Sequence, residues 1–546
     1  MRTNPEKQFL SNSTMNKKIV STLPVIILVG LITGSAIAAE VVKVIPRPAN
    51  VKSADGVFTL TGETIIVAGS PELTGMARYL ADLLAPATGL KLAVQSAGPA
   101  EAGIVLRLDA AANRLGDEGY TLVCSPKGVT ITGARPAGVF YGVQTLRQLL
   151  PVEVEQRGKV EGMAWTVPCV SIEDRPRFKW RGYLLDPARH FRPKEEIKRY
   201  IDLLAFQKLN VLQLHLTDDQ GWRVEIKKYP KLVEVGSRVP NHSRKTGEGW
   251  FYSQEDVKEL VAYAASRYVT IVPEIEMPGH SGAAIASYPE LACGGKHPGG
   301  WSAPLCVSQD AVLRFAKDVL DEIVAIFPSP YIHVGADEVP VGPWRGCPQC
   351  KAATDKLAGE KLPVDVVPFR IKQAAAGLPY HEDIGRLQGE FVREIDQHLA
   401  SKGRRMVGWD EILEGGLKTS SPAVVMAWRS ATAVAGATGR RRDVIVSIYP
   451  DYYLDNDTPL QRTYGQEPVP ANLPAGEEAH VLGVQANMWG EGTPTIEQVD
   501  MRSFPRLCAL SEVAWTPREA RNFEDFSARL KLFRVRLELL GVRMKE

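Results

Sequence analysis

Two adjacent carboxylates, Asp337 and Glu338, end the segment Tyr331-Ile-His-Val-Gly-Ala-Asp-Glu338. The apolar residues before them predict a buried strand, and Gly335-Ala336 predicts a turn at its end. Neighbouring side chains point in different directions, so the two carboxyls can have surroundings that separate their pKa values. One ionised and one protonated carboxyl can perform acid catalysis on a glycosidic bond. For an isolated Asp-Glu, two exposed acids at a helix N-terminus are the alternative.

The elements that must position this pair follow a repeating pattern. Strands and helical segments alternate from about residue 178, and one helix, expected over Ser253–Tyr268, opens with a Ser-x-x-Asp capping box. Further helices are predicted over Lys194–Lys208 and Gly385–Ser401, and the helical pattern weakens after the fifth and sixth strands. The predicted strands are Trp180–Asp186, Val211–Leu216, Val269–Ile275, Ile332–Gly335, Met406–Trp409, Val424–Trp428, Val444–Ile448 and Leu482–Gln485.

Eight such units predict an α/β fold, a (β/α)8 TIM barrel over residues 175–546 with a C-terminal helix. A doubly wound open sheet is the alternative, but no Gly-rich phosphate loop follows any strand. In a TIM barrel the residues after each strand converge at one face. These residues are Asp186, Arg189, Asp218, Asp219, Glu276, His280, Asp337, Glu338, Trp409, Asp410, Glu411, Trp428, Arg429, Tyr453, Asp455, Trp489 and Glu491.

Three of the strand ends contain a tryptophan beside a charged residue: Trp409, Trp428 and Trp489. Any one of them could belong to the core. Together they indicate an apolar-walled pocket with polar contacts, which suits a sugar because its ring faces stack on aromatic side chains while its hydroxyls need polar partners.

Residues 1–38 have the pattern of a signal peptide. Lys17 and Lys18 precede the apolar stretch Ile19–Ile32, and Ala36-Ile37-Ala38 supplies small residues for cleavage after Ala38. Met15 is as suitable a start as Met1, and a retained membrane anchor is the alternative. We expect export to the periplasm or the extracellular space, with no membrane contact after cleavage.

Residues 41–170 predict a small α+β domain before the barrel. Short β runs bounded by Gly or Pro alternate with two helical segments, at Glu72–Leu84 and Ala137–Leu150. No cluster of polar residues converges there, so we assign this domain a structural role.

Composition describes an ordinary globular protein of 546 residues with 45% hydrophobic and 23% charged residues. A formal net charge of +2 gives no reason to expect nucleic acid as a partner.

The seven cysteines are compatible with an oxidising compartment. Cys293 and Cys306 flank a Gly-rich loop that a disulfide could close, whereas Cys347-Pro-Gln-Cys350 is a lone CxxC. A zinc site needs a second pair of ligands, and the sequence places none nearby. A local disulfide or free thiols are therefore expected there, and we expect no metal ion and no cofactor. The remaining cysteines lie in apolar segments typical of a core: Cys124, Cys169 and Cys508.

Several motifs, in order, resemble glycoside hydrolase family 20, the exo-acting β-N-acetylhexosaminidases that remove terminal N-acetylglucosamine or N-acetylgalactosamine. The resemblance covers the chain from about residue 45 to its end. The motifs are Trp180-Arg-Gly-Tyr-Leu-Leu-Asp-Pro-Ala-Arg-His-Phe191, Leu214-His-Leu-Thr-Asp-Asp-Gln-Gly-Trp-Arg223, Glu276-Met-Pro-Gly-His280, His333-Val-Gly-Ala-Asp-Glu338, Gly408-Trp-Asp-Glu411 and Gln485-Ala-Asn-Met-Trp-Gly-Glu491.

The resemblance implies a role for each matching residue. Glu338 resembles the general acid, and Asp337 the residue that orients and stabilises the 2-acetamido group of the substrate, which itself attacks the anomeric carbon. Tyr453 resembles the tyrosine that hydrogen-bonds the acetamido carbonyl. Asp218 and His280 resemble the pair that supports the acid. The sugar would be bound by Trp409, Trp428 and Trp489 around the acetamido methyl and by Arg189, Asp455 and Glu491 at its hydroxyls.

The sequence departs from the family pattern in two places. Ala336 stands where a second glycine is common, which is costly if the φ angle there is positive. Residues Lys351–Asp383 form a longer, less patterned link, which is typical of a functional or mobile loop and could be a lid that restricts the aglycone.

Two other function classes fit the same barrel. A catalytically silent carbohydrate-binding protein would need the aromatic pocket and the arginine but no supported acid. A metal-dependent hydrolase could use His215, Asp218, His280 and Asp337, although no known metal motif is present. The expected partner is an oligosaccharide or glycoconjugate with a terminal N-acetylhexosamine. Its gluco or galacto configuration and natural source, and the oligomeric state of the protein, stay open.

Overall fold

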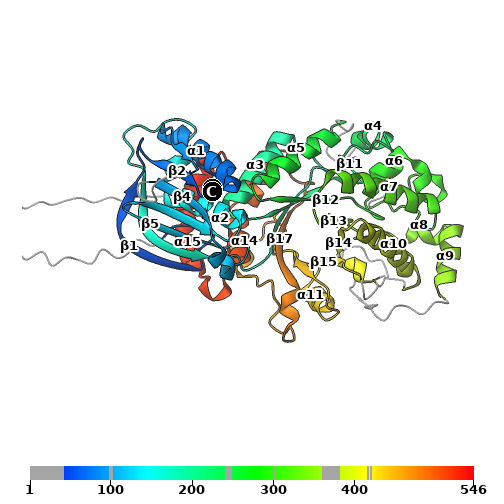
Figure 1. Cartoon of the computed structure of the whole chain (residues 1–546). Coiled ribbons are helices and arrows are strands. Elements are labelled where there is room, and N and C mark those ends of the chain that lie inside the picture. The colour runs from blue at the N-terminus through cyan, green and yellow to red at the C-terminus, as the bar shows by residue number, and fades with distance from the viewer. Residues whose placement is uncertain are drawn as a thin grey trace, which may run out of the picture. The chain divides into compact units, whose positions relative to one another are not determined.

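The computed structural model describes residues 42–96, 103–239, 249–299, 302–358, 382–414, 417 and 421–545 (Figure 1). The expected signal peptide lies outside these residues. Within the described part of the chain, no helix is both long and apolar enough to cross a membrane.

The first part of the structure is a seven-stranded mixed sheet in the order β1-β7-β5-β6-β4-β2-β3 (Figure 1). Two helices, α1 (Thr74–Thr88) and α2 (Pro136–Leu149), contact this sheet. This agrees with the small α+β domain predicted from the sequence. The sequence did not predict β3 and β7. The strands are β1 (Asn50–Thr59), β2 (Ile65–Ala68), β3 (Ala93–Gln95), β4 (Gly103–Leu108), β5 (Tyr120–Ser125), β6 (Gly128–Gly133) and β7 (Thr166–Asp174).

The second part is a closed barrel of eight parallel strands, which confirms the TIM-barrel prediction. Strand β17 closes the barrel by pairing with β8, so that Gln485 lies opposite Gly182. The strands are β8 (Trp180–Leu185), β9 (Val211–His215), β12 (Thr270–Glu274), β13 (Tyr331–His333), β14 (Arg405–Trp409), β15 (Val424–Ala427), β16 (Val444–Val446) and β17 (Val481–Met488). A two-stranded ribbon, β10 (Thr217–Asp218) and β11 (Gly221–Trp222), follows β9.

Helices connect the strands where the apolar periodicity predicted them. The capping box of α5 forms between Ser253 and Asp256. Between β14 and β15 the described residues form only the 3-10 turn η7 (Asp410–Leu413), in line with the weak helical pattern there. The α-helices of this part are α3 (Lys194–Phe206), α4 (Lys231–Glu234), α5 (Gln254–Ala265), α6 (Gly282–Ser287), α7 (Asp310–Ile326), α8 (Gly342–Arg345), α9 (Pro348–Ala358), α10 (Glu382–Ser401), α11 (Ala431–Thr438), α12 (Leu460–Gly465), α13 (Ile496–Ser503), α14 (Arg506–Trp515) and α15 (Phe523–Leu539).

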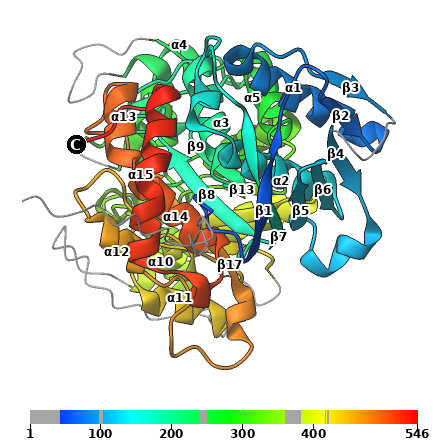
Figure 2. The same cartoon turned by 90° about the vertical axis from the view of Figure 1, so that its left-hand side faces the viewer.

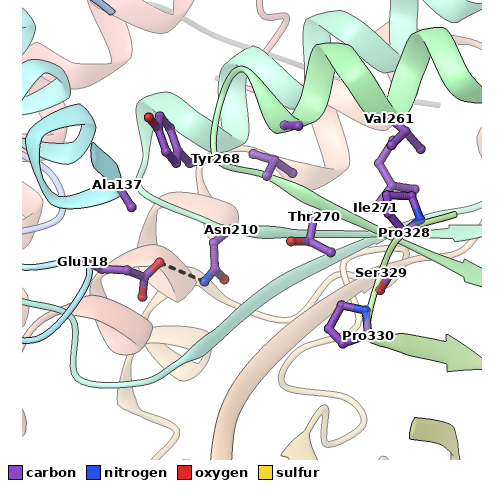
Figure 3. Close-up of a pocket in the computed structure, with 12 residues that line it drawn as sticks. Glu118, Ala137, Asn210, Val261, Tyr268, Thr270, Ile271, Pro328, Ser329 and Pro330 are labelled. Carbon is purple, nitrogen blue, oxygen red and sulfur yellow. Dashed lines mark hydrogen bonds between the residues drawn. The ribbon is translucent and has the colours of Figure 1, made fainter. Parts of the chain in front are cut away.

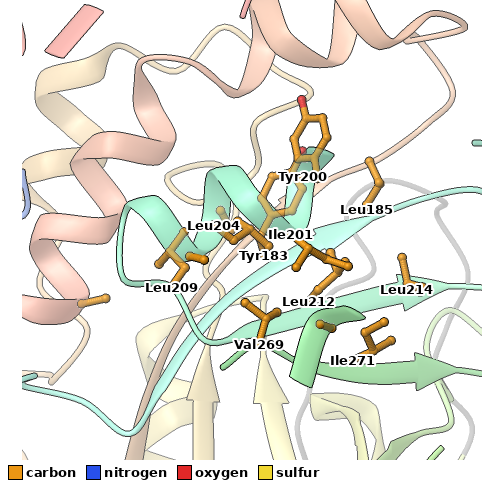
Figure 4. Packing of buried hydrophobic residues seen from close by; sticks show 14 of the residues in the cluster. Tyr183, Leu185, Tyr200, Ile201, Leu204, Leu209, Leu212, Leu214, Val269 and Ile271 are labelled. Atoms are coloured by element: carbon orange, nitrogen blue, oxygen red, sulfur yellow. The ribbon is translucent and has the colours of Figure 1, made fainter. Parts of the chain in front are cut away.

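The outer faces of the strands and the helices around them enclose one apolar layer. Helix α3 places its buried residues against β8, β9 and β12 (Figure 4). The rings of Tyr183 and Tyr200 stack there with their centroids 5.5 Å apart. A separate apolar cluster, which includes Trp180, Val272 and Trp409, fills the inside of the barrel. This interior is a packed core, so it holds the strand ends in fixed positions.

Ion pairs join the barrel to the sheet before it. Lys208 Nζ lies 3.0 Å from Asp174 Oδ2, both side chains being fully buried, and Arg181 Nη1 lies 2.8 Å from Glu118 Oε2. Burial lowers the pKa of Lys208, which Asp174 partly offsets. The C-terminal helices α14 and α15, red in Figure 2, are linked by the buried pair of Arg529 and Glu512 at 2.7 Å. Loss of either partner of such a pair is strongly destabilising.

Two expectations need correction. The link expected to lack pattern begins with helix, because α9 extends to Ala358 and α10 starts at Glu382; residues 359–381 lie outside the described part, so the lid stays a prediction. The CxxC was expected to lack a second pair of ligands, and this was wrong: Cys293 and Cys306 lie beside Cys347 and Cys350. All seven cysteines have free thiols in this structure, so no disulfide is seen.

Candidate active site

The candidate site lies at the carboxyl ends of the barrel strands. At the opposite end, a cavity of about 340 Å³ is lined by Thr270, the first residue of β12, and by Pro330, which precedes β13 (Figure 3). Glu118 accepts a hydrogen bond of 3.1 Å from Asn210 in that cavity. None of the residues expected at the active site lines this cavity. We assign the cavity no role in the chemistry.

The backbone turns sharply between β13 and the carboxylate pair. Gly335, Ala336 and Glu338 have φ angles of 63°, 71° and 47°. A Cβ on Gly335 would lie 1.7 Å from Glu276 Oε2, so only glycine fits there. The φ angle of Ala336 is positive, and this conformation is unfavourable for a residue with an L side chain. Alanine is therefore costly at this position, which the sequence left open. Strain of this kind is concentrated at functional sites.

Arg189 is buried and bonded on several sides. Its Nη1 donates to Asp186 Oδ2 at 3.0 Å, and its Nε donates to Gln220 Oε1 at 3.0 Å. Its Nη2 lies 2.7 Å from Asp218 Oδ2 and 3.4 Å from Glu491 Oε1. The guanidinium also lies over the Trp489 ring, 5.2 Å from the ring centroid. This network fixes the arginine beside the mouth of the barrel.

His280 lies between Asp218 and the carboxylate pair. Its Nδ1 is 3.4 Å from Asp218 Oδ1, and its Nε2 is 3.8 Å from Asp337 Oδ2 and 3.7 Å from Glu338 Oε2. Burial would lower the pKa of His280, but the neighbouring carboxylates, Asp218 most strongly, raise it well above its usual value. The ring is thus held as a cation by carboxylates on both sides.

Asp337 is more enclosed than Glu338. Their side chains are 12% and 32% exposed. Burial raises the pKa of Asp337 to about 6, against the lowering effect of His280, and the charge of Glu338 adds to the rise. Asp337 Oδ1 is buried and has no hydrogen-bond partner among the described residues. A buried, unpaired oxygen that faces the site is suited to accept a hydrogen bond from a ligand.

Four aromatic side chains at the strand ends, Trp409, Trp428, Tyr453 and Trp489, form one aromatic wall. Ring centroids are separated by 5.8 Å between Trp409 and Trp489, 6.3 Å between Tyr453 and Trp489, and 6.2 Å between Trp428 and Tyr453. Trp428 Nε1 donates to Glu411 Oε2 at 3.1 Å. The three tryptophans are therefore joined by ring contacts, with Tyr453 between Trp428 and Trp489. That they wall a sugar pocket stays a prediction.

Tyr453 and Asp455 complete the site on the side of β16 and β17. Burial, followed by the charge of Asp337, raises the pKa of Tyr453 well above its usual value, so its hydroxyl keeps its proton. Burial raises the pKa of Asp455 to about 6, with a further rise from Glu491. Asp455 Oδ1 is also buried and without a partner in the described part of the chain. The eleven residues to which the family resemblance assigns a role are thus linked by contacts or charge interactions at one end of the barrel.

Sequence reasoning missed Glu274, a buried carboxyl within the barrel that supports this site. Glu274 accepts from Trp409 Nε1 at 2.9 Å and lies 2.8 Å from His215 Nδ1 and 3.0 Å from His333 Nδ1. Burial would lower the pKa of His215, but Glu274 and Asp218 raise it to about 10. The charged residue in the apolar strand Thr270–Glu274 was the available sequence signal.

Glu276 was noted in the sequence but assigned no role. It is 3% exposed, and neither carboxylate oxygen has a hydrogen-bond partner among the described residues. Burial, then the charges of Asp337 and Glu274, raise its pKa well above the usual value. Its carboxyl is therefore harder to ionise than that of an exposed glutamate, and it packs against Gly335.

Carboxylates and histidines in this site are close enough to surround an ion. Three such groups lie among the described residues: His215 with Glu274 and Glu276, Asp218 with Asp219 and His280, and His280 with Asp337 and Glu338. The Arg189 guanidinium already contacts Asp218, and its positive charge disfavours a metal ion beside that carboxylate. The arrangement is better suited to proton transfer and to binding a cationic transition state.

Comparisons with known proteins agree with the resemblance in the sequence. Residues 178–518 match the family described as "Glycosyl hydrolase family 20, catalytic domain", and residues 41–175 match "Glycosyl hydrolase family 20, domain 2".

Curated relatives are similar over most of the chain. A beta-hexosaminidase of Porphyromonas gingivalis is 39% identical over 92% of this chain, which spans 64% of the length of that relative. A beta-N-acetylhexosaminidase of Cellulomonas fimi is 32% identical over 90% of this chain and 93% of its own length.

Solved structures have the same fold. The beta-N-acetylhexosaminidase of Streptomyces coelicolor has a TM-score of 0.78 at 34% identity, covering 92% of this chain and 97% of its own. An exo beta-N-acetylglucosaminidase of Vibrio harveyi, solved in complex with N-acetylglucosamine, has a TM-score of 0.80 at 30% identity, covering 92% of this chain and 78% of its own.

Proposed function

The chain belongs to glycoside hydrolase family 20, and from that membership we propose that it is an exo-acting, retaining β-N-acetylhexosaminidase. Its substrates are oligosaccharides or glycoconjugates with a terminal, non-reducing, β-linked N-acetylglucosamine or N-acetylgalactosamine. Catalysis uses the 2-acetamido group of the substrate as the nucleophile. The observation that supports this best is the different burial of two adjacent carboxyls that share one histidine.

Adjacent carboxyls on one chain do not flank a sugar from opposite faces. The carboxylate oxygens of Asp337 and Glu338 lie within 4.8 Å of each other and of His280 Nε2. An enzyme carboxylate acting as nucleophile would need the face of the sugar opposite the acid. The pair instead suits an acid at the leaving oxygen and a carboxylate beside the acetamido nitrogen, which is the arrangement that substrate assistance requires.

Each reacting group then has a defined partner. Glu338 donates a proton to the leaving oxygen as the acetamido oxygen attacks the anomeric carbon. Asp337 accepts a hydrogen bond from the acetamido N–H and stabilises the positive charge of the resulting oxazolinium ring. The Tyr453 hydroxyl donates to the attacking oxygen and holds it in line.

The second step returns the site to its starting state. Water attacks the anomeric carbon from the side the leaving group vacated, and Glu338 takes its proton as general base. Two inversions give net retention. Glu338 is then protonated again, as at the start. His280, paired with Asp218, lies 3.7 Å from Glu338 Oε2, beside the carboxylate that exists between the two steps.

The aromatic wall and Arg189 give the site its preference for the sugar. Trp409, Trp428 and Trp489 enclose the acetamido methyl, and Arg189 and Glu491 bind ring hydroxyls at the mouth. Asp455, whose Oδ1 lacks a partner within the described residues, accepts from a further hydroxyl. A pocket with apolar walls and a few fixed polar groups binds one small ring tightly.

Hydrolysis of matched aryl glycosides tests this function. A nitrophenyl β-N-acetylglucosaminide should be cleaved, with the β-anomer as the first product in a proton NMR time course, and the glucoside without the acetamido group should be a very poor substrate. First release of the α-anomer, or equal rates on both glycosides, contradicts the proposal. No hydrolysis at all favours the carbohydrate-binding alternative, and hydrolysis lost on chelation while the fold stays intact favours the metal-dependent one.

We also propose that the protein is exported through its N-terminal signal, which Lys17, Lys18 and the apolar stretch Ile19–Ile32 support. Expression of the full chain followed by fractionation and N-terminal sequencing tests this. Mature protein starting near Ala39 in the periplasm or medium is expected, whereas full-length protein in the cytosol or membrane fraction contradicts it.

A further inference from the structure

Four cysteine side chains meet beside the active site. Cys293 starts the short turn η6 (Cys293–Gly295), Cys306 lies before α7, and Cys347 and Cys350 lie at the start of α9. Their four sulfur atoms all lie within 4.8 Å of one another. Cys293 is half-buried and the other three are buried. The two pairs come from segments more than 40 residues apart, Cys306 and Cys347 being 41 residues apart.

Three of the six sulfur separations match the edges of a tetrahedron around one metal ion, and the other three are within 4.8 Å. Sγ–Sγ distances are 3.7 Å from Cys293 to Cys350, 3.6 Å from Cys306 to Cys350 and 3.9 Å from Cys306 to Cys347. Zinc binds thiolates at about 2.3 Å with tetrahedral geometry, which places neighbouring sulfurs about 3.8 Å apart. A disulfide would hold two sulfurs about 2.0 Å apart.

We propose that these residues form a structural zinc site with the ligand set Cys293, Cys306, Cys347 and Cys350. One Zn²⁺ replaces the four thiol protons, which are released to water, and the site becomes a tetrathiolate with a charge of −2. Thiolates select soft ions, and four protein ligands fill the tetrahedral shell. The ion therefore has no open position for water or substrate and takes no part in hydrolysis.

The site joins two loops that border the catalytic groups. On one side, Cys306 N donates to Leu291 O at 2.8 Å, and Leu305 N donates to Pro278 O at 2.8 Å, two residues before His280. On the other side, Trp344 Nε1, six residues after Glu338, donates to Leu305 O at 2.8 Å. The zinc thus fixes the loop that contains His280 to the segment that follows Glu338, and holds one wall of the active site.

The ion also compensates for the short elements in these loops. Helix α8 and turns η5 (Pro289–Leu291) and η6 have three or four residues each, so they gain little stability from their own hydrogen bonds. Metal binding that exists only in the folded state adds directly to the stability of that state. Removal of the ion should therefore lower stability more than it lowers the chemical rate at low temperature.

The test uses the full chain, purified without tags that bind metals and without added metal. Elemental analysis should find about one zinc per chain, released by a thiol-specific mercurial. Reconstitution of the zinc-depleted protein with Co²⁺ should give the intense d–d absorption bands of a tetrahedral tetrathiolate site. Metal-depleted protein should melt at a lower temperature and regain its melting temperature with Zn²⁺.

Matched double variants separate this site from any other metal-binding position. Cys347→Ala/Cys350→Ala should lose the zinc and the cobalt bands. The control Cys124→Ala/Cys169→Ala removes two neighbouring buried thiols from the N-terminal sheet and should keep both. If the first variant does not fold, the zinc content and cobalt spectrum of the unchanged chain still show whether a tetrathiolate zinc site is present.

Two results overturn the proposal. One is a purified chain without zinc that gives no tetrathiolate cobalt spectrum, whether its cysteines are free or joined in two disulfides. The other is a cobalt spectrum that survives in Cys347→Ala/Cys350→Ala. Neither result affects the proposed hydrolase, since its assay can be read on the same samples.

Discussion

The Nε2 atom of His280 lies 3.7 Å from Oε2 of Glu338, while its Nδ1 lies 3.4 Å from Asp218 Oδ1. Backbone strain at both residues supports this approach, because His280 and Glu338 have φ angles of 46° and 47°. The histidine therefore couples a buried carboxylate to the more exposed acid, and Glu338 should be the residue that exchanges protons with the substrate.

The first prediction follows from this role. In Glu338→Gln the proton donor is removed, so kcat should fall by about 10²–10⁴-fold on a glycoside with a poor leaving group. The loss should be much smaller on a nitrophenyl glycoside, because nitrophenolate leaves without a proton. Steady-state rates on the two substrates measure this. Equal losses on both would remove Glu338 from the role of acid.

Arg189 should bind the substrate rather than react with it. Arg189→Lys keeps the charge but loses the planar fork that reaches Asp186, Asp218 and Gln220 at once. Substrate and free N-acetylglucosamine should both bind more weakly. The expected increase in Kd is roughly 10-fold or more for each hydrogen bond to the sugar that lysine cannot form, since hydrogen bonds to charged groups contribute about 1.5–3 kcal/mol.

A partly buried arginine outside the active site provides the control for that experiment. Arg199 on α3 pairs with Asp500 at 2.7 Å, away from the strand ends. Arg199→Lys should leave sugar affinity unchanged in calorimetric titration. Wild-type affinity in Arg189→Lys would show that Arg189 is structural.

The sequence predicted the eight strands and the residues after them because both depend on local patterns. Apolar runs bounded by charged residues predicted the eight barrel strands but not the ribbon β10–β11, and the Ser253–Asp256 capping box predicted the start of α5. The placement of Arg189 and Tyr453 in one site followed from the barrel itself, since parallel strands bring their carboxyl ends together.

What the sequence could not predict depends on packing between distant segments. Cys293 and Cys306 meet Cys347 and Cys350 only because two loops fold over neighbouring strands, so the lone CxxC was misleading. The pKa shift of Asp337 likewise depends on burial by residues from several strands. The missed strand β7 follows residues 151–165, which have no regular pattern, and is identified by its pairing with β1 and β5.

Ala336 should reduce stability because its φ is 71° in a fully buried turn. A left-handed conformation costs an L residue about 1–2 kcal/mol. Glycine avoids this strain, but it lowers the free energy of unfolding by about 0.4–1 kcal/mol because it gives the unfolded chain more conformational freedom. Ala336→Gly should therefore raise the free energy of unfolding by up to about 1 kcal/mol, measured by denaturant titration. Gln388 donates to the carbonyl of Ala336 at 2.8 Å, and that bond remains in the variant.

A buried alanine without positive φ provides the comparison. Ala427 ends β15 and is fully buried. Ala427→Gly should lower stability by about 0.5–1 kcal/mol, as glycine does within a strand. If Ala336→Gly lowers the free energy of unfolding as much as Ala427→Gly does, the backbone at Ala336 is not strained.

The last prediction concerns Asp337, whose pKa burial raises to about 6. The carboxylate must be ionised to stabilise an oxazolinium ring, so kcat/KM should fall as pH drops below about 6. The folded pKa lies above the unfolded value near 3.9. As pH rises between the two pKa values, the unfolded chain loses the Asp337 proton before the folded protein does. The Asp337 carboxyl therefore lowers the free energy of unfolding progressively over this range, and the full loss is reached above about pH 6.

Asp337→Asn should therefore separate function from stability. The amide has no charge to desolvate, so the variant should be more stable than the unchanged enzyme at pH 7, by on the order of 1–3 kcal/mol at 1.4 kcal/mol per pKa unit. The difference should disappear below about pH 4. Melting temperatures of both proteins from pH 4 to pH 8 measure it, and a variant less stable at pH 7 would contradict the raised pKa.

The same variant tests substrate assistance. A stable thiazoline that imitates the cyclic intermediate should bind the unchanged enzyme far more tightly than N-acetylglucosamine, as ligands resembling the transition state do. Asp337→Asn should abolish most of that difference, because the positive ring loses its carboxylate in a site with little water. Affinity for N-acetylglucosamine itself should change much less, since the neutral sugar keeps its interactions with Arg189 and the tryptophans. Equal weakening of both ligands would place Asp337 in general sugar binding and leave the acetamido group without its stabilising partner.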